Sequence, residues 1–239
     1  MKALVTGAGG GLGSATVAAF QAKGWHVVAT DRVSGPWTDK APAEVVVGEL
    51  TSADWAAEVG QTTPEGFDAV IAAHGVEGTG AIRALTTERV EFVMEANFAS
   101  VVAVHEATIG GLQKRRGAFV AISSQAGLQG EPSSTAYCAS KFALRSWMES
   151  RHRELAGSGV RYRTLCPGAT VTPLLRTAFE GWAKSEGVTY EDILARRSSA
   201  VPVGRLGRPA DIGAAAAWLA DLRTDAHVVA PVTGGEVMR

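Results

Sequence analysis

Cysteine is scarce in this sequence. Only Cys138 and Cys166 occur among 239 residues, and two cysteines are too few for a disulfide framework or a structural zinc site. The histidines at positions 26, 105, 152 and 227 also lack the spacing of metal ligands. We therefore expect no bound metal, and a reducing compartment such as the cytoplasm.

An excess of charge of one sign and a long apolar run are missing as well. The formal net charge is −1 and the pI is near 6.5, which gives no reason to expect a nucleic-acid or acidic-membrane partner. No segment has the length of a membrane span, and the first residues form a strand pattern and a glycine turn rather than a signal peptide. We expect a soluble protein that acts on a small molecule.

The sequence does contain enough apolar residues for a large core. Hydrophobic residues make up 46% of the chain, and no linker or change of composition divides it. Strand patterns alternate with helical patterns, which predicts an α/β fold with a doubly wound parallel sheet and helices on both faces. We expect residues 1–239 to form a single Rossmann-like domain.

The first strand pattern, residues 2–6, runs into a glycine-rich turn and then a helix. Glycines in such a turn let the backbone approach a pyrophosphate, and the N-terminus of the helix offers free N–H groups and a partial positive charge. The flanking strand and helix favour this interpretation over a merely flexible turn. The residues expected to bind a dinucleotide here are Gly7, Gly10, Gly11 and Leu12.

The second strand pattern ends in Asp31, which lies 18 residues after Gly13. A carboxylate at about this distance accepts a hydrogen bond from the 2′-hydroxyl of the adenosine ribose and repels a 2′-phosphate. Asp31 therefore predicts NAD rather than NADP. Arg32 is the opposing observation, because an arginine just after this strand could bind the phosphate of NADP.

Tyr137 and Lys141 lie one turn apart on one face of a predicted helix. A free tyrosine has a pKa of about 10, and roughly 4 kcal/mol of phenolate stabilisation is needed to bring this pKa to about 7. A cation about 4 Å away supplies energy of that order at an effective dielectric of about 20. The pair therefore predicts a tyrosine whose pKa is lowered and which exchanges a proton near neutral pH.

Ser124 lies 13 residues before Tyr137, at the end of the strand pattern AFVAIS. This serine, the Tyr-x-x-x-Lys spacing and the Thr-Gly-x-x-x-Gly-Leu-Gly turn together resemble the short-chain dehydrogenase/reductase family. The resemblance implies that Tyr137 is the acid–base and that Ser124 holds the reacting oxygen. It implies that Lys141 binds the nicotinamide ribose and lowers the tyrosine pKa, and that Asn97 positions a proton-relay water.

The resemblance also extends the cofactor site to the ends of later strands. The fourth strand departs from the family, because Ala72-Ala73-His74-Gly75 stands where Asn-Asn-Ala-Gly is common. The lost amides put in doubt the ties of this strand to its neighbours, and His74 is expected to pack or to hydrogen-bond rather than to catalyse. The further cofactor residues that the resemblance implies are Glu49, Leu50, Ala73, Gly75, Pro167, Gly168, Thr170 and Thr172, with Tyr137 and Lys141 from the catalytic helix.

Three further segments are informative. Residues 173–200 follow the cofactor turn, mix leucines and aromatics with charges, and are expected to form a substrate lid. Residues 86–116 indicate one long helix that is apolar on more than one face, and in the resembled family this helix and the Tyr137 helix form the main dimer surface, commonly within a tetramer. Residues 33–44 contain two prolines and a glycine, so we expect a shortened loop there.

These features predict an oxidoreductase that transfers a hydride between NAD(H) and a secondary alcohol or ketone, in a homodimer or homotetramer. An NADP-dependent carbonyl or 3-oxoacyl reductase is one alternative, and it depends on whether Asp31 or Arg32 dominates the adenosine pocket. A second alternative, of another class, is a non-catalytic dinucleotide-binding regulator. The altered residues 72–75 keep it open, whereas the intact catalytic positions disfavour it. Fold and motif do not identify the substrate.

Overall fold

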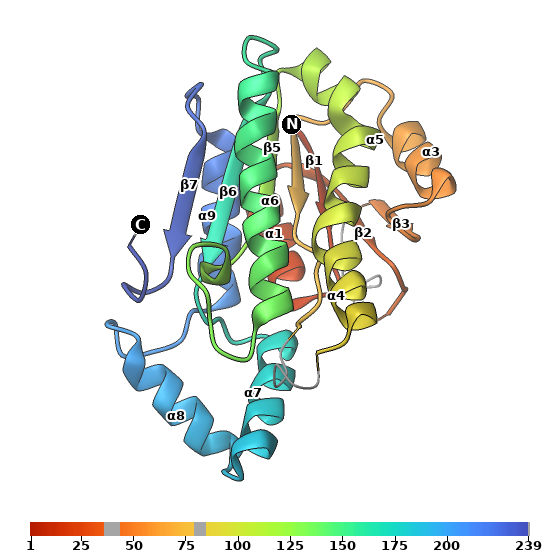
Figure 1. Cartoon of the computed structure of the whole chain (residues 1–239). Coiled ribbons are helices and arrows are strands. Elements are labelled where there is room, and N and C mark those ends of the chain that lie inside the picture. The colour runs from red at the N-terminus through yellow and green to blue at the C-terminus, as the bar shows by residue number, and fades with distance from the viewer. Residues whose placement is uncertain (36–43, 79–84, 239) are drawn as a thin grey trace.

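A seven-stranded parallel sheet forms the centre of the computed structural model, which describes residues 1–35, 44–78 and 85–238 (Figure 1). The strand order is β3-β2-β1-β4-β5-β6-β7. The order reverses between β1 and β4, so the predicted doubly wound α/β fold is confirmed. The strands are β1 (Lys2–Thr6), β2 (His26–Asp31), β3 (Glu44–Val47), β4 (Ala69–Ala72), β5 (Ala118–Ile122), β6 (Arg161–Pro167) and β7 (Val228–Val232).

Helices cover both faces of this sheet. The predicted helix 86–116 is α4 and α5 joined by a π-helical segment, Glu95–Ala99. Most of the predicted loop 33–44 lies outside the described residues. No helix in the described ranges has the length and hydropathy to cross a bilayer. The helices are α1 (Gly11–Ala22), α3 (Ala53–Thr62), α4 (Thr87–Met94), α5 (Ser100–Arg115), α6 (Thr135–Glu154), α7 (Pro173–Glu186), α8 (Tyr190–Ala200) and α9 (Pro209–Asp221).

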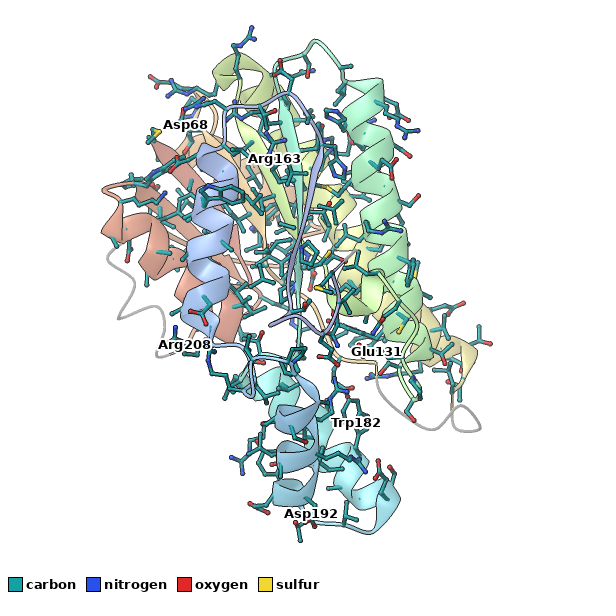
Figure 2. All side chains as sticks on the ribbon, turned by 90° about the vertical axis from the view of Figure 1, so that its left-hand side faces the viewer. Asp68, Glu131, Arg163, Trp182, Asp192 and Arg208 are labelled. Carbon is teal, nitrogen blue, oxygen red and sulfur yellow. The ribbon has the colours of Figure 1, made fainter. Side chains whose placement is uncertain are left out.

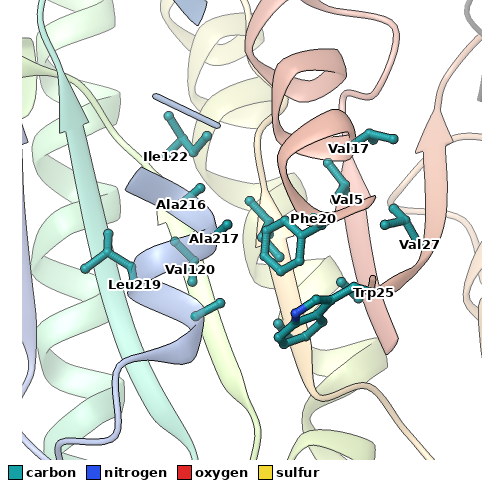
Figure 3. Close-up of a cluster of buried hydrophobic side chains, with 14 of the residues drawn as sticks. Val5, Val17, Phe20, Trp25, Val27, Val120, Ile122, Ala216, Ala217 and Leu219 are labelled. Carbon is teal, nitrogen blue, oxygen red and sulfur yellow. The ribbon is translucent and has the colours of Figure 1, made fainter. Parts of the chain in front are cut away.

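The strands bury side chains on both faces, which is typical of a parallel sheet. On one face, α1 and α9 pack against alternate strand residues such as Val5. Phe20 of α1 meets Trp25 edge to face there, with ring centroids 5.0 Å apart (Figure 3). The two helices approach so closely that a Cβ on Gly213 would overlap the carbonyl oxygen of Ala15. The glycine in α9 is therefore required by packing.

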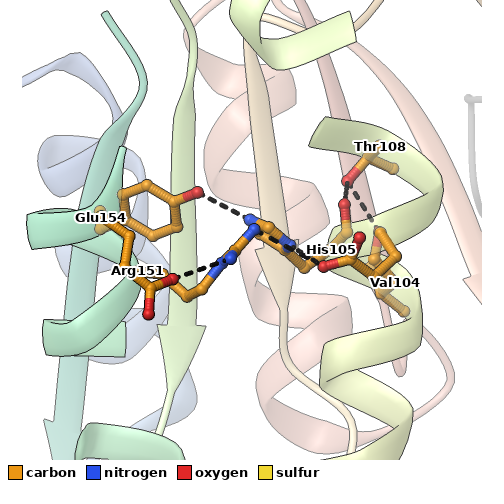
Figure 4. Close-up of polar contacts among 7 residues, drawn as sticks. Val104, His105, Thr108, Arg151 and Glu154 are labelled. Carbon is orange, nitrogen blue, oxygen red and sulfur yellow. Dashed lines mark hydrogen bonds and ion pairs between the residues drawn. The ribbon is translucent and has the colours of Figure 1, made fainter. Parts of the chain in front are cut away.

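On the opposite face, α3, α5 and α6 pack on the intervening strand residues. His105 of α5 is fully buried there (Figure 4). Its Nε2 lies 2.7 Å from the hydroxyl of Tyr162 on β6, and its Nδ1 lies 3.2 Å from the carboxylate of Glu106. Arg151 of α6 lies 3.7 Å from the same carboxylate. Burial lowers the pKa of His105, and the imidazole thus connects α5 with β6 and, through Glu106, with α6.

His74 connects the two strands at the switch point. Its Nδ1 lies 2.6 Å from Oγ1 of Thr6 at the end of β1, and its Nε2 lies 2.8 Å from Oγ of Ser100 on α5. Thr6 Oγ1 also accepts a hydrogen bond from the backbone N–H of Ala73. An imidazole therefore ties this strand to its neighbours where the resembled family commonly uses amides. The structure agrees with the predicted hydrogen-bonding role of His74.

The charge state of His74 suits these two hydroxyl partners. Burial lowers its pKa to about 3, and the positive charge of Lys141 acts in the same direction. The ring is therefore neutral at physiological pH. A neutral imidazole has one donor and one acceptor, so it can pair with a hydroxyl on each side.

Replacing His74 with asparagine is expected to make stability less sensitive to acid. In the unfolded chain a histidine binds a proton below about pH 6.5, whereas native His74 does so only near its pKa of about 3. Between these values the unfolded state holds more protons, so wild-type stability falls as pH falls. Through its proton, His74 lowers the free energy of unfolding by up to about 1.4 kcal/mol for each pH unit of acidification in this range. Urea unfolding between about pH 7 and pH 4.5 measures the slope for both proteins.

Ser100→Ala is the matched control for this experiment. It removes the hydrogen bonds of the Ser100 hydroxyl to His74 and to the carbonyl of Ala96 and keeps the imidazole, so it should lower the free energy of unfolding by about 1–3 kcal/mol at neutral pH and keep the wild-type dependence on pH. If the free energy of unfolding fell equally with pH in the wild type and in His74→Asn, the assignment of a neutral His74 would be contradicted.

Candidate active site

The predicted cofactor residues lie at the carboxyl ends of the strands, where the sheet order reverses. Gly7 has φ +65°, and a Cβ there would lie 2.7 Å from Cα of His74. A Cβ on Gly13 would overlap the carbonyl oxygen of Gly7. Glycine is therefore required at both positions. At Gly7 the turn after β1 packs directly on the backbone after β4, and at Gly13 helix α1 packs directly on the turn itself.

The N-terminus of α1 opens at this turn. No side chain caps it, and its first turn contains no acidic residue. The first N–H groups of a helix need partners and carry a partial positive charge, so they suit a diphosphate. Gly10 and Gly11 are at least partly exposed beside them, and the turn thus has the shape and charge that a dinucleotide requires.

Asp31 at the end of β2 faces the same turn. Its Oδ2 accepts a hydrogen bond from the N–H of Gly9 at 2.9 Å, and its Oδ1 accepts one from the N–H of Arg32 at 2.7 Å. Arg32 itself is exposed. After β3, Glu49 is exposed, whereas Leu50 is buried in the core cluster beneath α3. The carboxylate of Asp31 therefore lies against the glycine turn.

Asn97 lies in the π-helical segment and is fully buried. Its Oδ1 accepts from the N–H of Val76 at 2.7 Å, and its Nδ2 donates to the carbonyl of Val76 and to Ser140 Oγ, each at 3.0 Å. A Cβ on Gly75 would lie 2.9 Å from the Asn97 Oδ1. The amide thus fixes the chain after β4 against α6.

The predicted catalytic side chains converge next to this chain. Lys141 is buried, and its Nζ donates to the carbonyl of Ile122 at 3.1 Å and lies 5.7 Å from the centroid of the Tyr137 ring. Ser124 Oγ accepts from the N–H of Ala126 at 3.1 Å and interacts with the Tyr137 hydroxyl. Ser124, Tyr137 and Lys141 therefore occupy one site at the ends of β5 and α6.

The pKa of Tyr137 differs from the prediction. Burial raises it to about 12, the Ser124 hydroxyl opposes this shift, and the charges of Glu131 and Glu77 add to it. Burial also lowers the pKa of Lys141 to about 8. The predicted lowering of the tyrosine pKa assumed a fully charged ammonium about 4 Å from the phenol. The desolvation of both groups was not visible in the sequence.

The turn after β6 also lies at the carboxyl edge of the sheet, beside the glycine turn. Thr170 Oγ1 donates to the carbonyl of Gly168 at 2.9 Å. Thr172 caps α7 by accepting from the N–H of Leu175 at 3.2 Å, and its methyl group would lie 2.9 Å from a Cβ on Gly11. The turns after β1 and β6 are therefore in contact, with Pro167 at the start of the second.

A cavity of about 120 Å³ lies between these turns and the helix pair α7–α8. It connects the N-terminus of α1 with the predicted catalytic tyrosine, because Leu12 and Tyr137 both line it. Three polar residues that the sequence interpretation did not single out, Glu77, Gln125 and Glu131, also line it. In the sequence, Gln125 and Glu131 could have been recognised as candidates only by their position in the loop between Ser124 and Tyr137.

The donor set fits a nicotinamide dinucleotide. The uncapped helix, the glycine turn and the carboxylate of Asp31 suit the diphosphate and ribose of such a molecule. Within the described residues, no group of three or more histidine, cysteine, aspartate or glutamate side chains could hold a metal ion.

Comparison with known proteins agrees with this geometry. A family model described as short chain dehydrogenase matches residues 1–182. A protein of Escherichia coli named 2,3-dihydro-2,3-dihydroxybenzoate dehydrogenase is 31% identical over 222 residues, which is 90% of this chain and 88% of that protein. A protein of Xanthobacter autotrophicus named inactive 2-(S)-hydroxypropyl-CoM dehydrogenase 2 is 30% identical over 196 residues, which is 76% of this chain and 83% of that protein.

A solved structure supports the same assignment. A variant of actinorhodin polyketide ketoreductase with NADPH has a TM-score of 0.89 and 26% identity, with 98% of this chain and 96% of that chain covered. The family model covers well over half of the chain, and the fold, the glycine turn and the Ser-Tyr-Lys site agree with it. The chain belongs to the short-chain dehydrogenase family of oxidoreductases.

Proposed function

We propose that this protein is an NAD-dependent oxidoreductase that interconverts a secondary alcohol and a ketone. The observation that carries the proposal is that Ser124 and Tyr137 line one cavity, with Lys141 next to the Tyr137 ring, beside a turn suited to a dinucleotide. When it is bound, the nicotinamide accepts a hydride from the alcohol carbon or donates one to the ketone carbon.

The residues of the chain have separate roles in this proposal. Ser124 holds the reacting oxygen by a hydrogen bond from its Oγ. Tyr137 exchanges the proton of that oxygen at its Oη, and its high pKa makes it an acid that is fully protonated at neutral pH. Lys141 orients the nicotinamide ribose. Both ends of the Asn97 amide have protein partners, so we assign Asn97 a positioning role in the proton relay.

The preference for NAD rests on Asp31. Its carboxylate lies against the glycine turn through Gly9, where it would accept from a ribose hydroxyl and repel a 2′-phosphate. The remaining cofactor contacts that we propose follow the strand ends: Gly7, Gly10, Gly11, Leu12, Glu49, Leu50, Ala73, Gly75, Pro167, Gly168, Thr170 and Thr172.

The substrate lid, the cellular compartment and the oligomeric state are also part of the proposal. We assign residues 173–200, which form α7 and α8 beside the cavity, the role of a substrate lid within one domain. Both cysteines are free thiols, which suits a reducing compartment such as the cytoplasm. We assign the α5–α6 surface to a homodimer or homotetramer interface.

Tyr137→Phe is expected to lower turnover by at least about 10²- to 10⁴-fold, because it removes the general acid–base group. The phenyl ring keeps the packing of the site, so NAD affinity should stay close to that of the wild type. Steady-state absorbance assays with a panel of secondary alcohols measure the first quantity, and calorimetric titration with NAD measures the second. An active phenylalanine variant would refute the tyrosine mechanism.

Asp31→Asn is expected to shift the ratio of NADP to NAD affinity by about tenfold or more toward NADP. The amide keeps an acceptor for the Gly9 N–H and removes the negative charge near the 2′-position, and at an effective dielectric of about 20 one charge is worth about 2 kcal/mol or more at such distances. Titrations of wild type and variant with both dinucleotides measure the ratio.

Arg32→Ala is the counterpart variant. A wild-type preference for NADP that Arg32→Ala abolishes would favour the alternative, an NADP-dependent carbonyl or 3-oxoacyl reductase. Binding of a dinucleotide without turnover of any alcohol or ketone would favour the non-catalytic alternative, and the Xanthobacter autotrophicus relative is itself named an inactive dehydrogenase.

A further inference from the structure

The cavity beside Tyr137 has one polar wall, formed by the loop between β5 and α6. Gln125 is only 3% exposed, and its Nε2 donates to Oε1 of Glu131 at 2.8 Å. A carboxylate accepts and cannot donate, so this bond fixes the orientation of the Gln125 amide. Oε1 of Gln125 is therefore the second end of the amide, and it is buried without a hydrogen-bond partner.

An unpaired buried acceptor lowers the stability of a protein. Oε1 of Gln125 faces the turn after β6, because a Cβ on Gly168 would lie 2.9 Å from it, and Gln125, Gly168 and Tyr137 all line the same cavity. A molecule in this cavity that carries a hydroxyl donor would satisfy the acceptor. Glu131 has further lone pairs for a second donor.

The helix pair α7–α8 forms the facing wall, and it carries unpaired donors. Nε1 of Trp182 and Nε of Arg197 are buried without hydrogen-bond partners, and both residues line the cavity. Figure 2 labels Glu131 on the loop and Trp182 on the helix pair. The residues of one wall therefore carry acceptors and those of the other wall carry unpaired donors, and a hydroxyl group is both donor and acceptor.

The charges at the cavity disfavour an anion. Glu77 and Glu131 line it, and both act on the Tyr137 phenol as negative charges. The cation among the lining residues is Arg197, and its Nη2 lies 3.1 Å from the carboxylate of Glu236. Its charge is therefore compensated within the protein. Arg89 likewise lies 3.8 Å from the carboxylate of Glu77, so the repulsion that a substrate carboxylate would meet comes chiefly from Glu131.

We propose that this cavity selects a neutral, polyhydroxylated substrate, in which a second hydroxyl beside the reacting carbon donates to Gln125 Oε1 and Glu131. This inference rests on the proposed alcohol dehydrogenase function and specifies its substrate class. Gln125 and Glu131 are specificity-determining residues in this account, and Trp182 donates to the oxygen of an added hydroxyl from the opposite wall.

The test compares three alcohols: cyclohexanol, 1,2-cyclohexanediol and the anion 3-hydroxybutyrate. For the wild type with saturating NAD, we expect kcat/KM for the diol to exceed that for cyclohexanol by about tenfold or more, because the diol gains a hydrogen bond to a charged or otherwise unpaired group. The hydroxybutyrate should be the poorest of the three.

Gln125→Met keeps the length of the side chain and removes the acceptor. It should reduce the ratio of the diol kcat/KM to the cyclohexanol kcat/KM by about tenfold. Glu131→Gln should reduce the same ratio and raise the relative kcat/KM of the hydroxybutyrate. Glu58→Gln, which removes an exposed carboxylate from α3, is the matched control and should leave both ratios unchanged.

The pH profile separates a role in the cavity from a merely structural one. Tyr137 is surrounded by Glu131, Glu77, Cys138 and Lys141. The Glu131 charge raises the pKa of Tyr137, so Glu131→Gln should lower it. Alcohol oxidation rises with pH as the tyrosine loses its proton, and this rising limb should therefore move to lower pH. An unmoved limb would overturn the placement of Glu131.

Binding is measured separately from turnover, by calorimetric titration of NAD-saturated protein with each alcohol. Turnover of cyclohexanol with no preference for the diol would overturn the polyhydroxyl inference and leave the proposed function in place. No turnover of any alcohol, together with diol binding that Gln125→Met weakens, would overturn the proposed function and support the inference about the cavity. NAD affinity reports whether each variant is folded.

Discussion

The backbone contact between the turn after β1 and the chain after β4 is the constraint on which the site depends. Gly7 leaves room for the backbone of His74, and Gly13 leaves room for the carbonyl of Gly7. This contact brings two strand ends and the N-terminus of α1 to one point at the switch in strand order. Asp31 and Thr172 then pack against the same turn. Because the contact is made by backbone, nearby side chains can change, as His74 illustrates.

Burial acts in opposite directions on the two partners in the catalytic helix. It raises the pKa of Tyr137 to about 12 and lowers that of Lys141 to about 8, and both shifts favour the neutral forms. The site is therefore ready to give a proton, which is the direction that ketone reduction needs. In the proposed reaction the reverse step, alcohol oxidation, would need a positive charge near the phenolate, and Lys141, whose Nζ lies 5.7 Å from the ring centroid, is the cation of the chain placed to supply it.

The repeating patterns could be read from the sequence, and the tertiary contacts could not. The apolar strand AFVAIS and the four-residue spacing of Tyr137 and Lys141 are local, so the sheet, the glycine turn and the shared helix face were predictable. The direction of the Tyr137 pKa shift was not, because it depends on desolvation by residues far apart in sequence. The pairing of His74 with Thr6 and Ser100, 68 and 26 residues away, likewise required the folded register.

The helix pair α7–α8 has a small hydrophobic core of its own. Phe179, Ala183 and Ile193 are buried in it together with Val201 and Leu206, and none of these residues belongs to the two clusters that flank the sheet. Mutations in this small core can therefore reshape one wall of the cavity without disturbing the packing of the sheet. The fold thus separates the packing that shapes this wall of the cavity from the packing that holds the strand ends and the glycine turn in place.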